Sequence, residues 1–196
     1  VKCQDRLVRA FAMIAREHEN ARLLLVGKPM DRIFFDEVCA LREELGLTEK
    51  VAIIPGMERA AALKLMKDSN CFVLPSAVEG CSISLAEAAL LGVPAICTDV
   101  GTAYDVAEIS KGIRVIPGTG KGILQIHHKE LWSILCSDQH DFVETLALSM
   151  NKAIYEYDFL HAEAIAAIPR AAEWFSMDRA FDRFINVAGH IRAASL

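Results

Sequence analysis

Short apolar runs alternate with amphipathic segments over the first 117 residues, and this alternation limits the folds open to the chain. The run at 21–27 is largely apolar and closes at glycine, which is typical of a strand covered on both faces in a parallel sheet. Four more such runs follow, and the segments between them have helical spacing of apolar residues. The pattern predicts an α/β fold with a Rossmann-like, doubly wound parallel sheet. The expected strands cover 21–27, 51–54, 71–74, 93–98 and 113–116, and the expected helices cover 4–18, 32–45, 58–67, 84–91 and 102–108.

The pattern changes after residue 117, where extra helices are expected near 140–156 and in two stretches beyond it. In the last of these, apolar residues from Met177 to Ala188 form a stripe that must pack on something. A glycine-rich cluster at 118–122 lacks the further glycines of a dinucleotide or Walker loop, so a turn is the better interpretation. The pair His127 and His128 has no other ligand at metal-binding spacing and is better explained as a solvated loop.

Composition excludes several classes of protein. The chain has 21 basic and 26 acidic residues, a net charge of −5, so it has no excess of positive charge for nucleic acid. The longest nearly unbroken apolar stretch, 88–97, is about half of what a membrane-spanning helix needs, and no transmembrane segment is expected. The six cysteines include no close pair, and we expect them to be the buried free thiols of a cytoplasmic protein.

The strongest functional signal lies in residues 74–87, which follow an expected strand and lead into an expected helix. Ligands of parallel sheets bind at the carboxyl ends of the strands. Gly80 permits close approach of the backbone, and the free N–H groups of residues 81–84 lie where the helix dipole favours an anion. Two flanking carboxylates, Glu79 and Glu87, would accept hydroxyls of a sugar or ribose.

A structural explanation competes with ligand binding. Ser84 and Glu87 stand three apart at a helix start, which is the spacing of a capping box, and Glu79 could be a residue of a surface loop. These residues alone favour binding and capping equally.

Glu79 and Glu87 are separated by seven residues within the stretch Pro-Ser-Ala-Val-Glu-Gly-Cys-Ser-Ile-Ser-Leu-Ala-Glu. This stretch closely resembles the E-x7-E signature of retaining GT-B glycosyltransferases of family GT4, the glycosyl transferases group 1. Residues 118–140 match no pattern of that family. Further stretches resemble it in the same order, at 2–10, 22–27, 51–56, 68–76 and 98–101, and 174–184 resembles the helix that ends such proteins.

The resemblance implies a nucleotide-sugar site. In it Glu87 would hold the ribose hydroxyls, Glu79 would face the transferred sugar, and Lys2 would neutralise the departing diphosphate. Neither a metal ion nor another cofactor is expected, because this family uses basic side chains and amides in their place. The remaining implied donor-binding residues are Gly80, Cys81, Ser82 and Ile83 for sugar and diphosphate, with Gly56 and Met57 near the base.

Two positions depart from the family pattern. Cys3 stands where a glycine usually follows the lysine, and Cys81-Ser82 stand where Phe-Gly is usual. In the family, an opening strand and an arginine precede the lysine, and an acceptor-binding domain precedes both. The expectation is therefore a single domain, 1–196, that is the C-terminal donor half of a hexosyltransferase without its first strand and N-terminal domain.

Such a half would present apolar surface toward its partner domain, so self-association at high concentration is expected. One alternative is a nucleotide-sugar-binding module with no transfer activity. Another is a GT-B-fold epimerase that acts on UDP-GlcNAc. A further alternative is an ordinary doubly wound domain with a non-nucleotide ligand.

Overall fold

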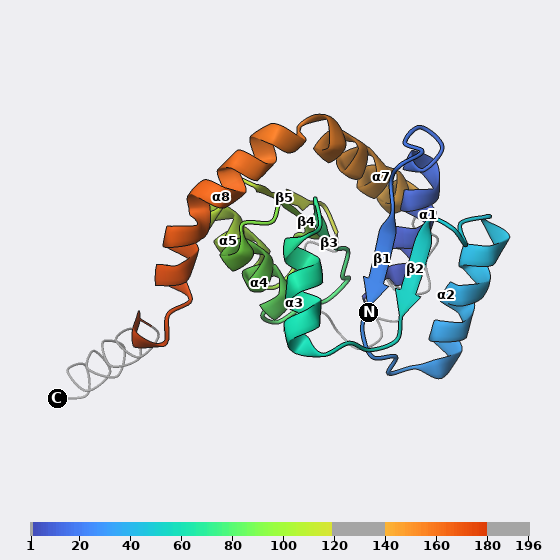
Figure 1. The fold of residues 1–196 in the computed structure, drawn as a ribbon, viewed down its shortest axis with the longest axis horizontal. Coiled ribbons are helices and arrows are strands. Elements are labelled where there is room, and N and C mark those ends of the chain that lie inside the picture. The colour runs from blue at the N-terminus through green and yellow to red at the C-terminus, as the bar shows by residue number, and fades with distance from the viewer. Residues whose placement is uncertain (1, 119–139, 180–196) are drawn as a thin grey trace.

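The computed structural model describes residues 2–118 and 140–179, which form an α/β fold of parallel strands and covering helices (Figure 1). The strands and helices expected before residue 117 are all present. The largest difference is the first helix, which ends at Ile14 instead of residue 18. The strands are β1 (Leu23–Val26), β2 (Val51–Ile54), β3 (Phe72–Leu74), β4 (Ala95–Thr98) and β5 (Ile113–Ile116). The helices are α1 (Gln4–Ile14), α2 (Arg32–Glu44), α3 (Arg59–Lys67), α4 (Ile83–Leu91), α5 (Ala103–Ile109), α7 (His140–Tyr155) and α8 (Tyr157–Trp174).

The helix expected near 140–156 is α7, and α8 follows it directly. Several predictions fall outside the described residues: most of the apolar stripe that begins at Met177, the cluster at 119–122, and the histidine pair at 127 and 128.

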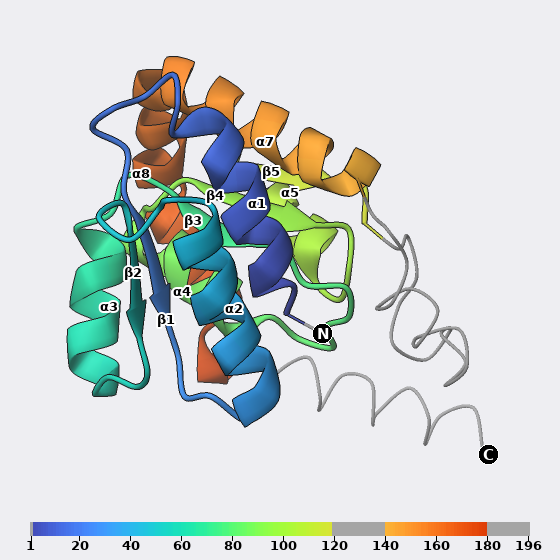
Figure 2. The ribbon, with the colours of Figure 1, turned by 90° about the vertical axis from the view of Figure 1, so that its right-hand side faces the viewer.

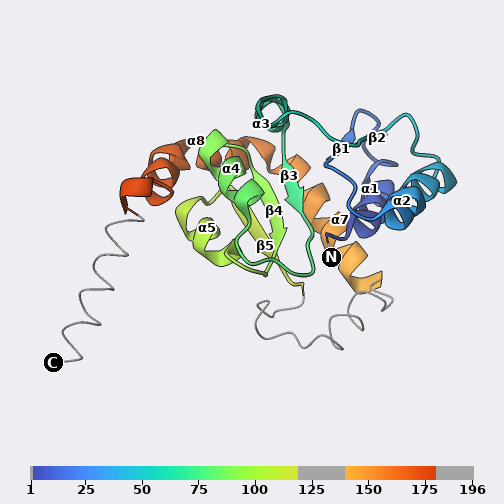
Figure 3. The same cartoon turned by 90° about the horizontal axis from the view of Figure 1, so that it is seen from below.

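The five strands form two parallel sheets. β1 pairs with β2, and β3, β4 and β5 pair in that order. Figures 1 and 3 place β1 and β3 at neighbouring edges, so the strands cross the fold in the order β2, β1, β3, β4, β5. The chain therefore winds outward from β1 in one direction and from β3 in the other. The reversal between β1 and β3 is a topological switch point, where α/β proteins bind ligands at the carboxyl edge.

The central strand β4 is buried along its whole length. Its side chains alternate between two apolar clusters, because successive residues of a strand point to opposite faces. Ile96 packs into the cluster formed with α1 and α7, whereas Ala95 and Cys97 pack into the cluster formed with α4, α5 and α8. Helices on both faces of this sheet confirm the predicted doubly wound architecture.

The prediction that the first strand is covered on both faces is wrong. Leu23 and Leu25 pack into the cluster that contains α1 and α2, but Leu24 and Val26 on the opposite face are exposed. The described helices cover one face of β1 only. A short apolar run cannot distinguish such a strand from one that is covered on both faces.

The two most extensive helix–helix contacts are those of α1 with α7 and of α4 with α8. α1 packs along α7, as Figure 2 shows, and α4 packs along α8. The second contact is close at Gly92, the C-cap of α4, where a Cβ would lie 2.8 Å from side-chain atoms of Ile165 and Ile168. Within the described ranges, none of the helices is long and apolar enough to cross a membrane.

Candidate functional site

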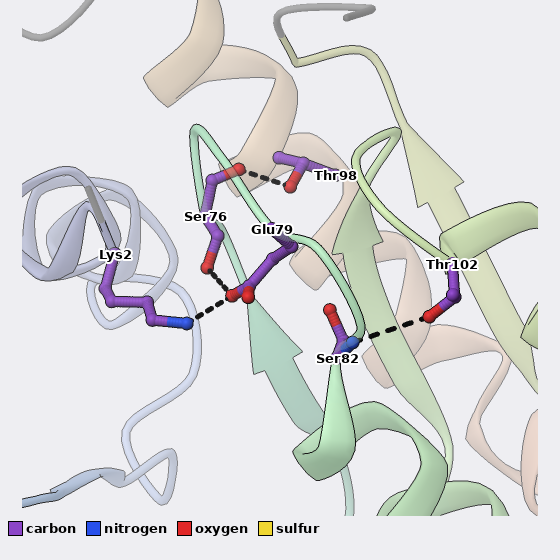
Figure 4. A network of polar contacts seen from close by, with 6 residues as sticks. All are labelled: Lys2, Ser76, Glu79, Ser82, Thr98 and Thr102. Atoms are coloured by element: carbon purple, nitrogen blue, oxygen red, sulfur yellow. Dashed lines mark hydrogen bonds and ion pairs between the residues drawn. The ribbon is translucent and has the colours of Figure 1, made fainter. Parts of the chain in front are cut away.

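Lys2 and Glu79 meet at the carboxyl edge of the strands, although they lie far apart in the sequence (Figure 4). Lys2 immediately precedes the start of α1, and Glu79 lies in the segment between β3 and α4, residues 75–82, which we call the Glu79 loop. The Lys2 ammonium forms an ion pair with Glu79 Oε1, and the Ser76 hydroxyl donates to the same oxygen at 2.7 Å. The structure thus brings together the two residues expected to be catalytic.

One oxygen of the Glu79 carboxylate has partners and the other does not. Its side chain is 10% exposed, while that of Lys2 is 53% exposed, so the lysine reaches the carboxylate from the solvent side. Both partners contact Oε1, and within residues 2–118 and 140–179 no hydrogen bond or ion pair reaches Oε2. That second oxygen is able to accept a hydroxyl of a ligand.

Glu87 lies in the second turn of α4, beside the Glu79 loop. Its Oε1 pairs with Nη2 of Arg59 at 2.5 Å, and the Glu87 side chain is 17% exposed against 72% for Arg59. Arg59 is the first residue of α3, where a cation opposes the helix dipole, so local helix electrostatics do not explain its position. Arg59 links Glu87 to the turn after β2, which contains the expected base-binding residues Gly56 and Met57, both exposed.

The capping-box alternative is contradicted by the structure. α4 begins at Ile83 with Ser82 as its N-cap, and the Ser82 side chain makes no capping hydrogen bond. Ser84 therefore lies inside the first turn, and Glu87 is too far along the helix to return a bond to the cap. The position of Glu87 is set by the helix and by Arg59.

The amides at the start of α4 are less free than expected. The Ser82 amide donates to Thr102 Oγ1 at 3.4 Å, and the Ile83 amide closes a tight turn on the Cys81 carbonyl at 3.0 Å. The amide N–H groups of Cys81 and Ser84 have no hydrogen-bond acceptor in the described part of the chain. Gly80, Cys81 and Ile83 are exposed as a binding loop requires, whereas Ser82 is buried and its hydroxyl has no partner among the described residues.

Cys3 adopts the left-handed conformation that explains the glycine of the family pattern. Its φ is 54°, the one positive φ at a non-glycine residue in the described ranges. The Arg6 guanidinium donates to the Cys3 sulfur at 3.1 Å, and burial raises the pKa of this thiol above its ordinary value. The strained turn directs Lys2 away from α1 and toward the Glu79 loop.

A cavity of about 450 Å³ lies behind the Glu79 loop, between α1, α7 and the ends of β4 and β5. Cys3, Arg6, Ser76 and Thr98 contribute to its lining, but Glu79 and Glu87 do not. The acidic pair therefore lies outside this cavity, at the open edge of the sheet. Among the described residues, no group of three or more His, Cys, Asp or Glu side chains could hold a metal ion.

Sequence reasoning missed two partners of the acidic pair. Ser76 lies within the quoted signature, but nothing in the spacing assigns its hydroxyl to Glu79. Arg59 carries no local signal at all, because its pairing joins two different helices.

The fold is that of the GT-B glycosyltransferases. Anabaena HepE, solved in complex with UDP, superposes with a TM-score of 0.73 at 18% identity, covering 96% of this chain and 45% of that protein. Sucrose-phosphate synthase from Thermosynechococcus elongatus gives a TM-score of 0.72 at 18% identity, covering 98% of this chain and 43% of the other.

Sequence comparison identifies the family: the chain belongs to the glycosyl transferases group 1, which it matches over residues 1–120. An uncharacterized glycosyltransferase of Methanocaldococcus jannaschii is 34% identical over 101 residues, 52% of this chain and 24% of that protein. A D-inositol 3-phosphate glycosyltransferase of Rhodococcus erythropolis is 26% identical over 190 residues, 95% of this chain and 38% of its own length. The chain thus spans well under half the length of these relatives.

Proposed function

We propose that this chain is the donor-binding half of a retaining glycosyltransferase of family GT4, which transfers a hexose from a nucleoside-diphosphate sugar. The observation that carries the proposal is the meeting of Lys2, Ser76 and Glu79 at the switch point, with Oε2 of Glu79 left open. A glutamate that merely forms part of a surface loop needs neither a lysine from a distant part of the sequence nor a serine to orient it. The UDP bound in Anabaena HepE supports a uridine nucleotide as the first ligand to try.

Each residue has a role that its position supports. Glu79 Oε2 accepts a hydroxyl of the transferred sugar, and Glu87 accepts the ribose hydroxyls with the oxygen that Arg59 does not hold. The amides of Cys81 and Ser84, together with Lys2, face the diphosphate. As the bond to the sugar breaks, negative charge grows on the diphosphate, and the exposed Lys2 ammonium stabilises it. In this proposal these groups supply the positive charge, and no metal ion or other cofactor takes part.

The proposal assigns the acceptor to a separate N-terminal GT-B domain. Large apolar side chains are exposed around the carboxyl edge, which suits a partner surface. They come from the segments after β1 and β4 and from the start of α4, namely Met30, Ile33, Ile83 and Tyr104.

The test is calorimetric titration of the chain with UDP, GDP and ADP and with their glucose conjugates, followed by an assay for transfer. We expect weak binding of a nucleoside diphosphate and no transfer by this chain alone, because both halves are needed to position the reacting carbon. Failure to bind any of these ligands would refute the donor site, and robust glycosylation of an acceptor by the chain alone would refute its assignment as half of the enzyme.

A further inference from the structure

The segment that ends β4 and leads into α5, residues 98–102, lies against the Glu79 loop along most of its length. We call it the β4–α5 turn. At the start of the loop, the Thr98 hydroxyl donates to the Ser76 carbonyl at 2.5 Å, with both residues fully buried (Figure 4). Because Ser76 in turn donates to Glu79, this contact fixes the residue that orients the carboxylate.

In the middle of the loop the contact is made by a residue without a side chain. Gly101 has φ +60°, and a Cβ built on it would lie 2.6 Å from the Gly80 carbonyl oxygen and 3.0 Å from Glu79 Cβ. A carbonyl oxygen of the backbone cannot rotate away as a flexible side chain can. Any side chain at position 101 must therefore displace the backbone of the loop at Glu79 and Gly80.

At the end of the loop the contact comes from Thr102. This residue is the N-cap of α5, where a threonine hydroxyl ordinarily accepts from its own helix, yet it makes no capping hydrogen bond. Its Oγ1 instead accepts from the Ser82 amide at 3.4 Å. One short segment thus contacts the beginning, the middle and the end of the loop.

We propose that the β4–α5 turn is a positioning element for the sugar subsite, and that Gly101 sets the place of Glu79 without contacting the donor. This inference rests on the proposed function for its ligands. Glu87 is positioned differently, by α4 and by Arg59, and neither belongs to the turn. The turn should therefore control the sugar and diphosphate contacts and leave the ribose contacts unchanged.

The chain offers a matched control for a test of Gly101. Gly46, after α2, has φ +67°, and nothing lies within 4 Å of a Cβ built on it. Gly46→Ala and Gly101→Ala therefore impose the same kind of backbone strain, but only the second displaces the loop. Both variants are titrated with UDP, 2′,3′-dideoxy-UDP and UDP-glucose.

For Gly101→Ala we expect the affinity for UDP to fall about tenfold and that for UDP-glucose about a hundredfold, while the ratio of UDP to dideoxy-UDP affinity keeps its wild-type value. Gly46→Ala should bind all three like wild type. Simple loss of folded protein would lower the three affinities by one common factor, and that result would overturn the inference. Thr102→Val, which keeps the side-chain shape but removes the acceptor, should give the same pattern at about two- to threefold.

Amide chemical shifts supply a readout that needs no ligand. Gly101→Ala should shift the resonances of residues 76–82, and Gly46→Ala should shift only those around the end of α2. If wild type binds none of the three nucleotides but these shifts appear, the proposed function fails and the positioning role stands. Unchanged resonances of 76–82 in Gly101→Ala would refute the positioning role.

Discussion

Replacing Glu87 by glutamine should separate ligand binding from stability. The substitution keeps the shape of the side chain and removes its charge, so a ribose hydroxyl meets a neutral acceptor. A hydrogen bond to a charged group contributes about 1.5–3 kcal/mol, which corresponds to about ten- to a hundredfold in Kd. The low exposure of Glu87 places the expected loss for UDP within this range.

The effect on stability should be small. The lost ion pair has an arginine that is 72% exposed, and such pairs contribute about 0–1 kcal/mol because solvent screens them. For a domain of this size that is a shift in Tm of at most about 4 °C. No helix cap is lost, because Glu87 does not cap α4.

The assay is calorimetric titration with UDP and 2′,3′-dideoxy-UDP, run beside thermal melts. In wild type UDP should bind more tightly than the dideoxy analogue, and in Glu87→Gln that ratio should fall by the factor lost for UDP. Glu108→Gln, the same change at an exposed position on α5, is the control and should bind both as wild type does. Equal weakening of both ligands, or unchanged UDP affinity, would refute the ribose role.

Three further predictions concern other groups. Glu79→Ala should weaken UDP-glucose about ten- to a hundredfold and leave UDP nearly unchanged in paired titrations, and equal losses for both would make Glu79 a structural residue of the loop. Cys81 is the exposed cysteine of the described ranges, so treatment with iodoacetamide should abolish later binding of UDP-glucose unless UDP protects the site during the treatment. Cys81→Ala should still bind UDP-glucose after the same treatment, and loss of its binding would contradict the assignment. Burial raises the pKa of Cys97 to about 12 from 9.0, so the unfolded thiol ionises first and folding stability should fall by about 1.4 kcal/mol per pH unit between these values. In urea titrations from pH 8 to 11, Cys97→Ala should lessen this loss and Cys81→Ala should not; identical slopes in both variants would contradict the burial argument.

Much of the fold could be predicted because its signals are local. Apolar runs closed by glycine or proline define strands such as β2 and β5 to the residue, and the same reading correctly puts Glu79 in the loop before α4 and Glu87 inside that helix. The capping-box alternative also rests on a local signal, but it requires Ser84 to be the N-cap of the helix. The first residue of a helix is the feature that local patterns predict least well, and this alternative is wrong for that reason.

Contacts between elements could not be predicted in this way. Arg59 pairs with a glutamate on another helix, and Gly101 leaves room for a glutamate in another loop. Nothing in their own neighbourhoods indicates the contact. Gly101 stands in a turn, where glycine is expected on conformational grounds alone, so its second role as the residue that leaves room for the Glu79 loop has no separate signal.

The division of the strands into two sheets has a mechanical consequence. Backbone hydrogen bonds make each sheet stiff, but in the described residues none crosses from β1 to β3, so the two parts are held by side-chain packing such as that of Phe11 and Leu146 between α1 and α7. Lys2 lies on the side of β1 and Glu79 on the side of β3. The spacing between cation and carboxylate therefore depends on how densely α1 and α7 pack along their length. A truncated side chain in that interface would loosen the ion pair without altering either of its partners.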